Sequence, residues 1–177
     1  MAPRIEKMML TPEEIREGVW RLARQISTDY EGKEILLVGV LKGAFVFLAD
    51  LARLITVPVQ FDFIAVSSYG SATKTSGVVR IKKDLDMDVR GKHVIIVEDI
   101  VDTGLTLAYL MRNMLARGPA SLEVCALLEK EIPGKSEVNI KYVGFKIPDV
   151  FVVGYGLDWA ENYRNLPYIA ALSKDSQ

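Results

Sequence analysis

Apolar residues occur in blocks along the chain, and the first block has the spacing of a helix that buries one face. Thr11 and Glu14 frame its start as a Thr-x-x-Glu capping box, and Pro12 suits the first turn. The apolar positions that follow fall on one side of such a helix: Ile15, Val19, Leu22, Ala23 and Ile26. The pattern predicts an amphipathic helix that begins after Thr11.

The next blocks are short and continuously apolar, which is typical of strands buried on both faces of a sheet. We expect a strand of alternating polarity over 78–89 and apolar strands over 35–40, 57–66, 94–97, 124–128 and 150–155. Helices fit the segments 44–54 and about 106–117. Residues 67–77, SSYGSATKTSG, are small, polar and turn-forming, and predict a mobile loop. Buried strands that alternate with helices predict an α/β fold with a mostly parallel, doubly wound sheet.

Composition narrows the class of protein. The chain has 177 residues, half of them hydrophobic and a quarter charged, which favours one globular domain. Its net charge of −1 gives no electrostatic footprint for nucleic acid or an anionic membrane. One cysteine fits a reducing compartment, and no apolar run approaches the ~20 residues that span a bilayer. The N-terminus lacks the features of a signal peptide, so we expect a cytoplasmic protein with no nucleic-acid or membrane partner.

The segment 94–106, VIIVEDIVDTGLT, carries the strongest chemical signal. An apolar strand runs into Glu98, Asp99 and Asp102, and then into Thr-Gly-Leu-Thr at the start of a helix. Free N–H groups at a helix start, with two hydroxyls and a glycine, can bind a phosphate. The carboxylates could accept hydrogen bonds from sugar hydroxyls, hold a divalent cation or act as a base. The segment therefore predicts a site for a phosphorylated sugar; an acidic helix cap is the alternative, but a cap does not need three carboxylates.

This segment resembles the phosphoribosyl-pyrophosphate signature of type I phosphoribosyltransferases, and its Glu-Asp-Ile-Val-Asp-Thr-Gly run is similar to the hypoxanthine-guanine branch. Residues 41–43 resemble the pyrophosphate loop of that branch, and 143–158 its purine-binding segment. The resemblance extends over about 8–173 in matching order. It implies the type I phosphoribosyltransferase fold as one domain over 1–177, with a core of about 30–150 and a small hood from about 1–29 and 151–177.

The resemblance implies purine salvage, in which 5-phosphoribose passes from phosphoribosyl pyrophosphate to N9 of hypoxanthine or guanine. The products are IMP or GMP and pyrophosphate, and the cofactor is Mg²⁺. Asp102 is the implied general base. Glu98 and Asp99 are implied to bind the ribose hydroxyls, directly or through the metal. The implied 5′-phosphate site consists of Thr103, Gly104, Leu105 and Thr106.

The remaining implied roles fall on residues that are ambiguous by themselves. Lys42, Gly43 and Arg164 bind pyrophosphate, and a cis peptide is expected between Leu41 and Lys42. In the implied purine site, Lys130 donates to the 6-oxo group and the ring of Phe151 stacks on the base. The backbone of Val152 and the side chain of Asp158 complete this site, and Asp158 is also an implied Mg²⁺ ligand. Ser68 and Tyr69 belong to a flexible lid. From the residues alone, Lys42 and Lys130 could be solvated lysines, Phe151 plain core, and Asp158 with Arg164 a surface ion pair.

Other motifs and functions are less well supported. Residues 84–88 open like a calcium loop but lack its glycine and glutamate, and Gly154-x-Gly156 is followed by Trp159, not glycine. His93 and Cys125 carry no partner pattern. One alternative is a phosphoribosyltransferase that uses another base, namely adenine, uracil or orotate, and Lys130 argues against it. The other alternative is an RNA-binding regulator on the same fold, and the lack of a basic face argues against that one. The resemblance also implies a homodimer or homotetramer.

Overall fold

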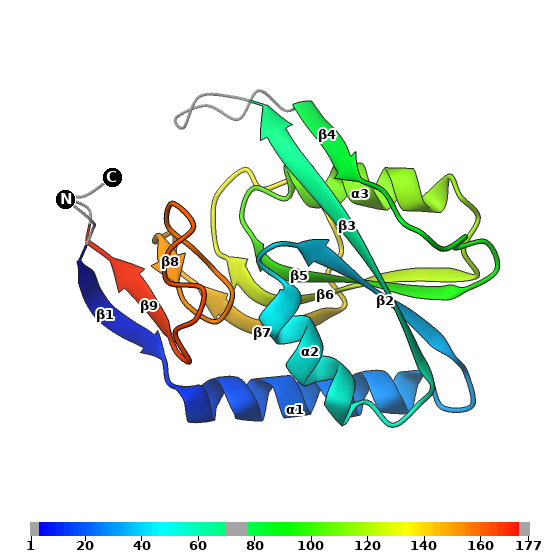
Figure 1. Ribbon diagram of the computed structural model, residues 1–177, viewed down its shortest axis with the longest axis horizontal. Coiled ribbons are helices and arrows are strands. Elements are labelled where there is room, and N and C mark those ends of the chain that lie inside the picture. Colours follow the sequence, from blue (N-terminus) through cyan, green and yellow to red (C-terminus); the bar gives the residue numbers. More distant parts are fainter. Residues whose placement is uncertain (1–3, 70–77, 174–177) are drawn as a thin grey trace.

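A six-stranded sheet forms the centre of the computed structural model, which describes residues 4–69 and 78–173 (Figure 1). Its strand order is β4-β3-β2-β5-β6-β7, and every neighbouring pair is parallel except β3 with β4. The strands are β2 (Ile35–Leu41), β3 (Val59–Tyr69), β4 (Val78–Lys83), β5 (His93–Val101), β6 (Ser121–Lys130) and β7 (Tyr142–Ile147). The predicted α/β class with a mostly parallel sheet is confirmed.

Helices cover both faces of this sheet (Figure 1). One face packs against α1 (Pro12–Asp29) and α2 (Phe45–Leu54), and the other against α3 (Leu105–Leu115). Alternate residues of one strand therefore enter different cores: Ile95 faces α1 and α2, whereas Ile96 faces α3. Both cores are apolar, which explains why the strands read as unbroken apolar runs.

The first helix forms as its sequence predicts. Thr11 is the N-cap, with Oγ1 accepting a hydrogen bond from the Glu14 N–H at 3.1 Å, and Pro12 lies in the first turn. The five predicted apolar positions are all buried. The helix packs against α2 and β7, so its apolar face becomes part of the domain core.

A second, three-stranded sheet joins the two ends of the chain. Its order is β1-β9-β8, all antiparallel, with β1 (Ile5–Leu10), β8 (Val152–Val153) and β9 (Ile169–Leu172). The predicted strand over 150–155 was wrong, because only β8 is extended and it pairs in this second sheet. The fifth parallel strand of the main sheet is β7, which the sequence pattern had not indicated.

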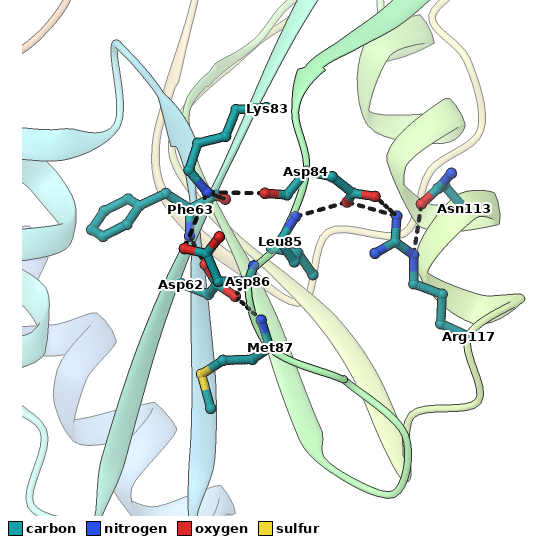
Figure 2. Close-up of polar contacts among 9 residues, drawn as sticks. All are labelled: Asp62, Phe63, Lys83, Asp84, Leu85, Asp86, Met87, Asn113 and Arg117. Atoms are coloured by element: carbon teal, nitrogen blue, oxygen red, sulfur yellow. Dashed lines mark hydrogen bonds and ion pairs between the residues drawn. The ribbon is translucent and has the colours of Figure 1, made fainter.

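The predicted strand over 78–89 was also wrong in its second half, because β4 ends at Lys83. Beyond that point the chain turns onto the buried carboxylate of Asp62 (Figure 2). Oδ2 of Asp62 accepts hydrogen bonds from the backbone N–H groups of Asp86 and Met87, at 2.9 and 2.8 Å. These N–H groups are thus satisfied by a side chain, so the segment needs no neighbouring strand.

The predicted loop over 67–77 begins later than expected, since β3 extends to Tyr69 and pairs Ser68 with Val79. Residues 70–77 lie outside the described part of the chain. Among the described residues, no helix has the length and apolarity needed to cross a membrane.

Candidate active site

Four parallel strands end at one edge of the main sheet, and polar residues lie at or just after those ends, three of them predicted from the sequence and one, Asp149, not. Lys42 follows β2, Asp99 lies near the end of β5, Lys130 is the last residue of β6, and Asp149 follows β7. Parallel topology thereby brings together side chains that are far apart in sequence. The peptide between Leu41 and Lys42 is cis, as expected.

Glu98 and Asp99 are adjacent carboxyl groups within β5. Burial of Glu98, together with its charge and hydrogen-bond interactions with Asp99, raises its pKa well above the ordinary value. Burial also raises the pKa of Asp99 to about 6, although the N–H of Ile100 donates to Oδ1 at 2.7 Å and favours the charged form. Burial thus favours the protonated form of both carboxyl groups, which opposes the build-up of negative charge beneath the site.

Asp99 lies directly against the Gly43 backbone. A Cβ atom on Gly43 would stand 1.7 Å from Asp99 Oδ2. On its other side, a Cβ on Gly156, whose φ is +98°, would stand 2.3 Å from the Gly43 carbonyl oxygen. Three segments meet here without room for a side chain, so both glycines are required by close approach.

The N-terminus of α3 follows directly after Asp102. Gly104 is its N-cap with φ +82°, and no described side chain caps the helix. The Leu105 N–H makes a long, 3.4 Å contact with Thr103 Oγ1, and the Thr103 carbonyl accepts from the Ser136 N–H at 2.8 Å. The hydrogen bond from Ser136 thus holds the connection between β5 and α3 in place, while N–H groups in the first turn of α3 remain able to bind an anion.

Lys130 is buried between two carboxylates. Its side chain is 10 % exposed, and Nζ lies 3.3 Å from both Asp102 Oδ2 and Asp149 Oδ1. This arrangement excludes a solvated strand terminus. It also places the predicted general base in contact with the predicted purine-reading lysine.

A chain of ion pairs connects Lys42 with the C-terminal segment. Glu161 bridges two cations: Oε2 lies 2.8 Å from Lys42 Nζ and Oε1 lies 3.0 Å from Arg164 Nη2. These hydrogen bonds hold the pKa of Glu161 below its ordinary value. Arg164 also contacts Asp158 Oδ1 at 3.2 Å and donates from Nη1 to the Gly156 carbonyl at 2.7 Å.

Val152 is the first residue of β8 in the second sheet, and Phe151 precedes it on the C-terminal side of Asp149. The Phe151 side chain is exposed, which excludes plain core, whereas Val152 is buried. Ser68 and Tyr69 lie at the end of β3, the neighbour of β2 in the sheet.

Comparison with known proteins gives one consistent answer. Residues 8–160 match the family model described as the phosphoribosyl transferase domain. The hypoxanthine-guanine phosphoribosyltransferase of Mycobacterium tuberculosis is 55% identical over 174 residues, covering 95% of this chain and 86% of the relative. That of Bacillus subtilis is 47% identical over 168 residues, covering 95% and 93%. The chain belongs to the hypoxanthine-guanine phosphoribosyltransferase family.

A solved structure of this phosphoribosyltransferase family has the same fold. The hypoxanthine-guanine phosphoribosyltransferase of Bacillus anthracis superimposes with a TM-score of 0.89 at 48% identity, covering 96% of this chain and 98% of that one. That crystal structure holds a HEPES molecule in its active site. The predicted family and type I phosphoribosyltransferase fold are thereby confirmed.

The phosphoribosyltransferase reaction calls for a divalent cation, and the carboxylates of this chain fit one kind of site. The described residues contain no group of three or more acidic, histidine or cysteine side chains that could hold a metal by themselves. Mg²⁺ is commonly bound by one or two carboxylates together with water and phosphate oxygens of a substrate. Asp158 and Asp99 fit that second arrangement, whereas Glu98 is buried.

Three residues of this phosphoribosyltransferase site were not predicted: Asp149, Gly156 and Glu161. Asp149 and Gly156 lie inside segments that already carried the resemblance, but only the structure brings them against Lys130 and Gly43. Glu161 lies between two predicted residues, Asp158 and Arg164, so this spacing was its only signal. By contrast, Cys125 is fully buried, and burial raises the pKa of its thiol far above the ordinary value.

Proposed function

We propose that this chain catalyses Mg²⁺-dependent transfer of 5-phosphoribose from phosphoribosyl pyrophosphate to N9 of hypoxanthine or guanine. The products are the nucleoside monophosphate, IMP or GMP, and pyrophosphate, which makes the reaction a step of purine salvage. The observation that carries the proposal is the meeting of Asp102 and Lys130 at the carboxyl edge of the sheet. One group can take a proton from the purine while the other reads its 6-oxo oxygen.

The donor is bound by the β5–α3 connection. Residues Thr103, Gly104, Leu105 and Thr106 take the 5′-phosphate, mainly through backbone N–H groups at the uncapped start of α3. Asp99 and Glu98 lie below the ribose, and their carboxyl groups accept or donate hydrogen bonds to its hydroxyls. Their raised pKa values favour the protonated forms, and protonation lowers the repulsion between this pair and the donor phosphates.

Pyrophosphate is bound by Lys42, the Gly43 backbone and Arg164. When bound, Mg²⁺ supplies positive charge that neutralises the leaving pyrophosphate. Asp158 and Asp99 are the residues that would hold it. Negative charge develops on pyrophosphate as the glycosidic bond breaks, so preorganised cations stabilise the transition state more than the ground state.

The purine lies between Phe151 and Lys130. The Lys130 ammonium donates to a 6-oxo group, which selects hypoxanthine and guanine over adenine, whose 6-amino group offers no acceptor. The Phe151 ring stacks on the base, and Val152 backbone groups read its edge. Asp102 accepts the proton from the imidazole ring as N9 attacks the ribose carbon.

Some proposals extend beyond the site itself. We place the protein in the cytoplasm as a homodimer or homotetramer, on the basis of the family. Ser68 and Tyr69 would belong to a lid that excludes water from the donor. The hood remains a proposal as well: the second sheet carries Val152, and the segment between β8 and β9 carries Asp158 and Arg164.

An absorbance assay with phosphoribosyl pyrophosphate and Mg²⁺ tests the reaction. We expect turnover with hypoxanthine and guanine that is abolished by EDTA, and none with adenine or uracil. Turnover of adenine or uracil alone would assign another branch. Folded protein that turns over no base would overturn the enzyme proposal, and a nucleic-acid filter assay at low and moderate salt would then test the RNA-binding alternative.

A further inference from the structure

Glu161 is a charged side chain with no part in the transfer described above, yet it contacts two residues of the proposed pyrophosphate site. Its carboxylate oxygens lie 2.8 Å from Lys42 Nζ and 3.0 Å from Arg164 Nη2. One anionic group therefore uses donors from both sides of the position where an anionic leaving group would bind. Its side chain is 63% exposed, so an incoming ligand can displace it without disturbing the core.

The turn that carries Glu161 presents the carboxylate in a defined direction. Ala160, Glu161 and Tyr163 have φ values of +48°, +67° and +75°, which residues other than glycine rarely adopt. The Glu161 N–H donates to Asp158 Oδ2 at 2.8 Å, and Trp159 and Asn162 exchange backbone hydrogen bonds across the turn. Such a conformation persists only where its surroundings hold it.

Arg164 does not need Glu161 to hold its position. Nη1 donates to the Gly156 carbonyl at 2.7 Å, and Nη2 contacts Asp158 at 3.2 Å. Arg164 Nε is buried without a hydrogen-bond partner among residues 4–69 and 78–173, so the guanidinium has donor capacity in reserve. A support for Arg164 is therefore a poor explanation of the Glu161 contact, whereas occupation of an anion position explains both oxygen contacts.

We propose that the Glu161 carboxylate occupies the pyrophosphate position between Lys42 and Arg164 in the free protein and competes with donor and product for these two cations. The proposal rests on the proposed function, because that function assigns Lys42 and Arg164 to pyrophosphate. Competition weakens donor binding, and it also speeds release of pyrophosphate, since the carboxylate can re-form both ion pairs as the product leaves. Glu161 is thus a residue that sets affinity at this subsite without touching the purine.

The test compares Glu161→Gln with wild type by isothermal titration calorimetry, with inorganic pyrophosphate and Mg²⁺ as the probe. The amide keeps the size of the side chain and removes its charge. We expect pyrophosphate to bind about two- to tenfold more tightly to the variant, because the exposed ion pairs that must break are individually weak. In the transfer assay, the KM for phosphoribosyl pyrophosphate should fall by a similar factor, with a smaller change in kcat.

Glu31→Gln is the matched control, because it removes the same charge from an exposed residue between α1 and β2, at the opposite end of β2 from Lys42. It should leave pyrophosphate binding unchanged. Weaker or unchanged binding by Glu161→Gln would overturn the proposal, and weaker binding would make Glu161 a support for the two cations. Wild-type turnover without detectable pyrophosphate binding would also overturn it, whereas absence of turnover with every base would overturn the proposed function as well.

Discussion

The Nζ atom of Lys130 lies 3.3 Å from Oδ2 of Asp102, so the proposed purine-reading group and the proposed general base form an ion pair. The same ammonium lies 3.3 Å from Asp149 Oδ1. Asp102 and Asp149 are therefore equivalent as partners of Lys130, but only Asp102 lies on the β5–α3 connection that would bind the ribose. We therefore expect Asp102 to have a chemical role and Asp149 to position Lys130.

Asp102→Asn is expected to lower kcat by about 10²- to 10⁴-fold, because an amide cannot accept the purine proton. Binding of phosphoribosyl pyrophosphate, measured by calorimetry, should change much less. Asp149→Asn is the matched control, since it removes the other carboxylate of Lys130. It should raise the KM for hypoxanthine less than about tenfold and leave kcat nearly unchanged. Equal losses of kcat in the two variants would argue against Asp102 as the base.

Gly43→Ala is expected to destabilise the fold and weaken donor binding, because its Cβ would overlap Asp99 Oδ2. Overpacking of this kind costs about 1–3 kcal/mol, measurable by urea unfolding. Asp99→Ala in the same chain removes the obstructing carboxylate, so the double variant should regain stability relative to Gly43→Ala. If the double variant were instead as unstable as the sum of the two changes, the contact would not be the cause.

Asp99 predicts a dependence of stability on pH. Its pKa in the folded protein, about 6, is higher than in the unfolded chain, so the folded state holds the proton more tightly. The contribution of this group to stability is present below about pH 4 and is lost as the pH rises through about 6. Asp99→Asn should therefore raise the free energy of unfolding at pH 7 by about 1–3 kcal/mol and have little effect at pH 4.

Asp84 supplies the control for that pH series, because its pKa shifts the other way. Slight burial opposes ionisation of Asp84, but two hydrogen bonds from Arg117 Nη2, at 2.7 and 2.9 Å, lower the pKa overall (Figure 2). Its contribution is present above the unfolded pKa and is lost as the pH falls. Asp84→Asn should destabilise at pH 7 and progressively less as the pH falls below about 4. Opposite signs for the two variants at pH 7 are the diagnostic result.

Asp62→Ala is expected to lower the free energy of unfolding by about 2–4 kcal/mol, because it leaves the N–H groups of Asp86 and Met87 without their acceptor. Hydrogen exchange at these two amides should accelerate more than exchange at Ile95 in β5. Asp86→Asn, which changes an exposed carboxylate of the same turn, should cost less than about 0.5 kcal/mol. Unchanged exchange in Asp62→Ala would mean that the turn is held by other contacts.

Periodicity predicted the helices and the central strands because their residues satisfy local rules. Thr11, Pro12 and Glu14 cap α1 through contacts within one turn, and continuous apolar runs mark strands with a helix on each face. The segment 84–89 has the alternation of a strand, but its N–H groups are taken by Asp62, more than twenty residues earlier. No local pattern contains that partner.

Much of the candidate site could be predicted because the β5–α3 connection is contiguous in sequence, from Glu98 to Thr106. The contacts that join it to other segments were beyond the reach of sequence pattern. Asp99 meets Gly43 and Lys130 meets Asp149 only because parallel strands end at one edge. Glu161 had no apparent partner until the turn after β8 came to lie against Lys42.

The pairing of β1 with β9 has a consequence for the order in which a newly made chain matures. Ile5 pairs with Leu172, so β1 has no partner strand until residue 172 has left the ribosome, about 10–30 s after β1 itself at ordinary rates of synthesis. The main sheet ends at Ile147 and can assemble earlier. The segment with Asp158, Glu161 and Arg164 lies between β8 and β9, and its framework closes last. A nascent chain can therefore assemble its main sheet before it gains the complete pyrophosphate site.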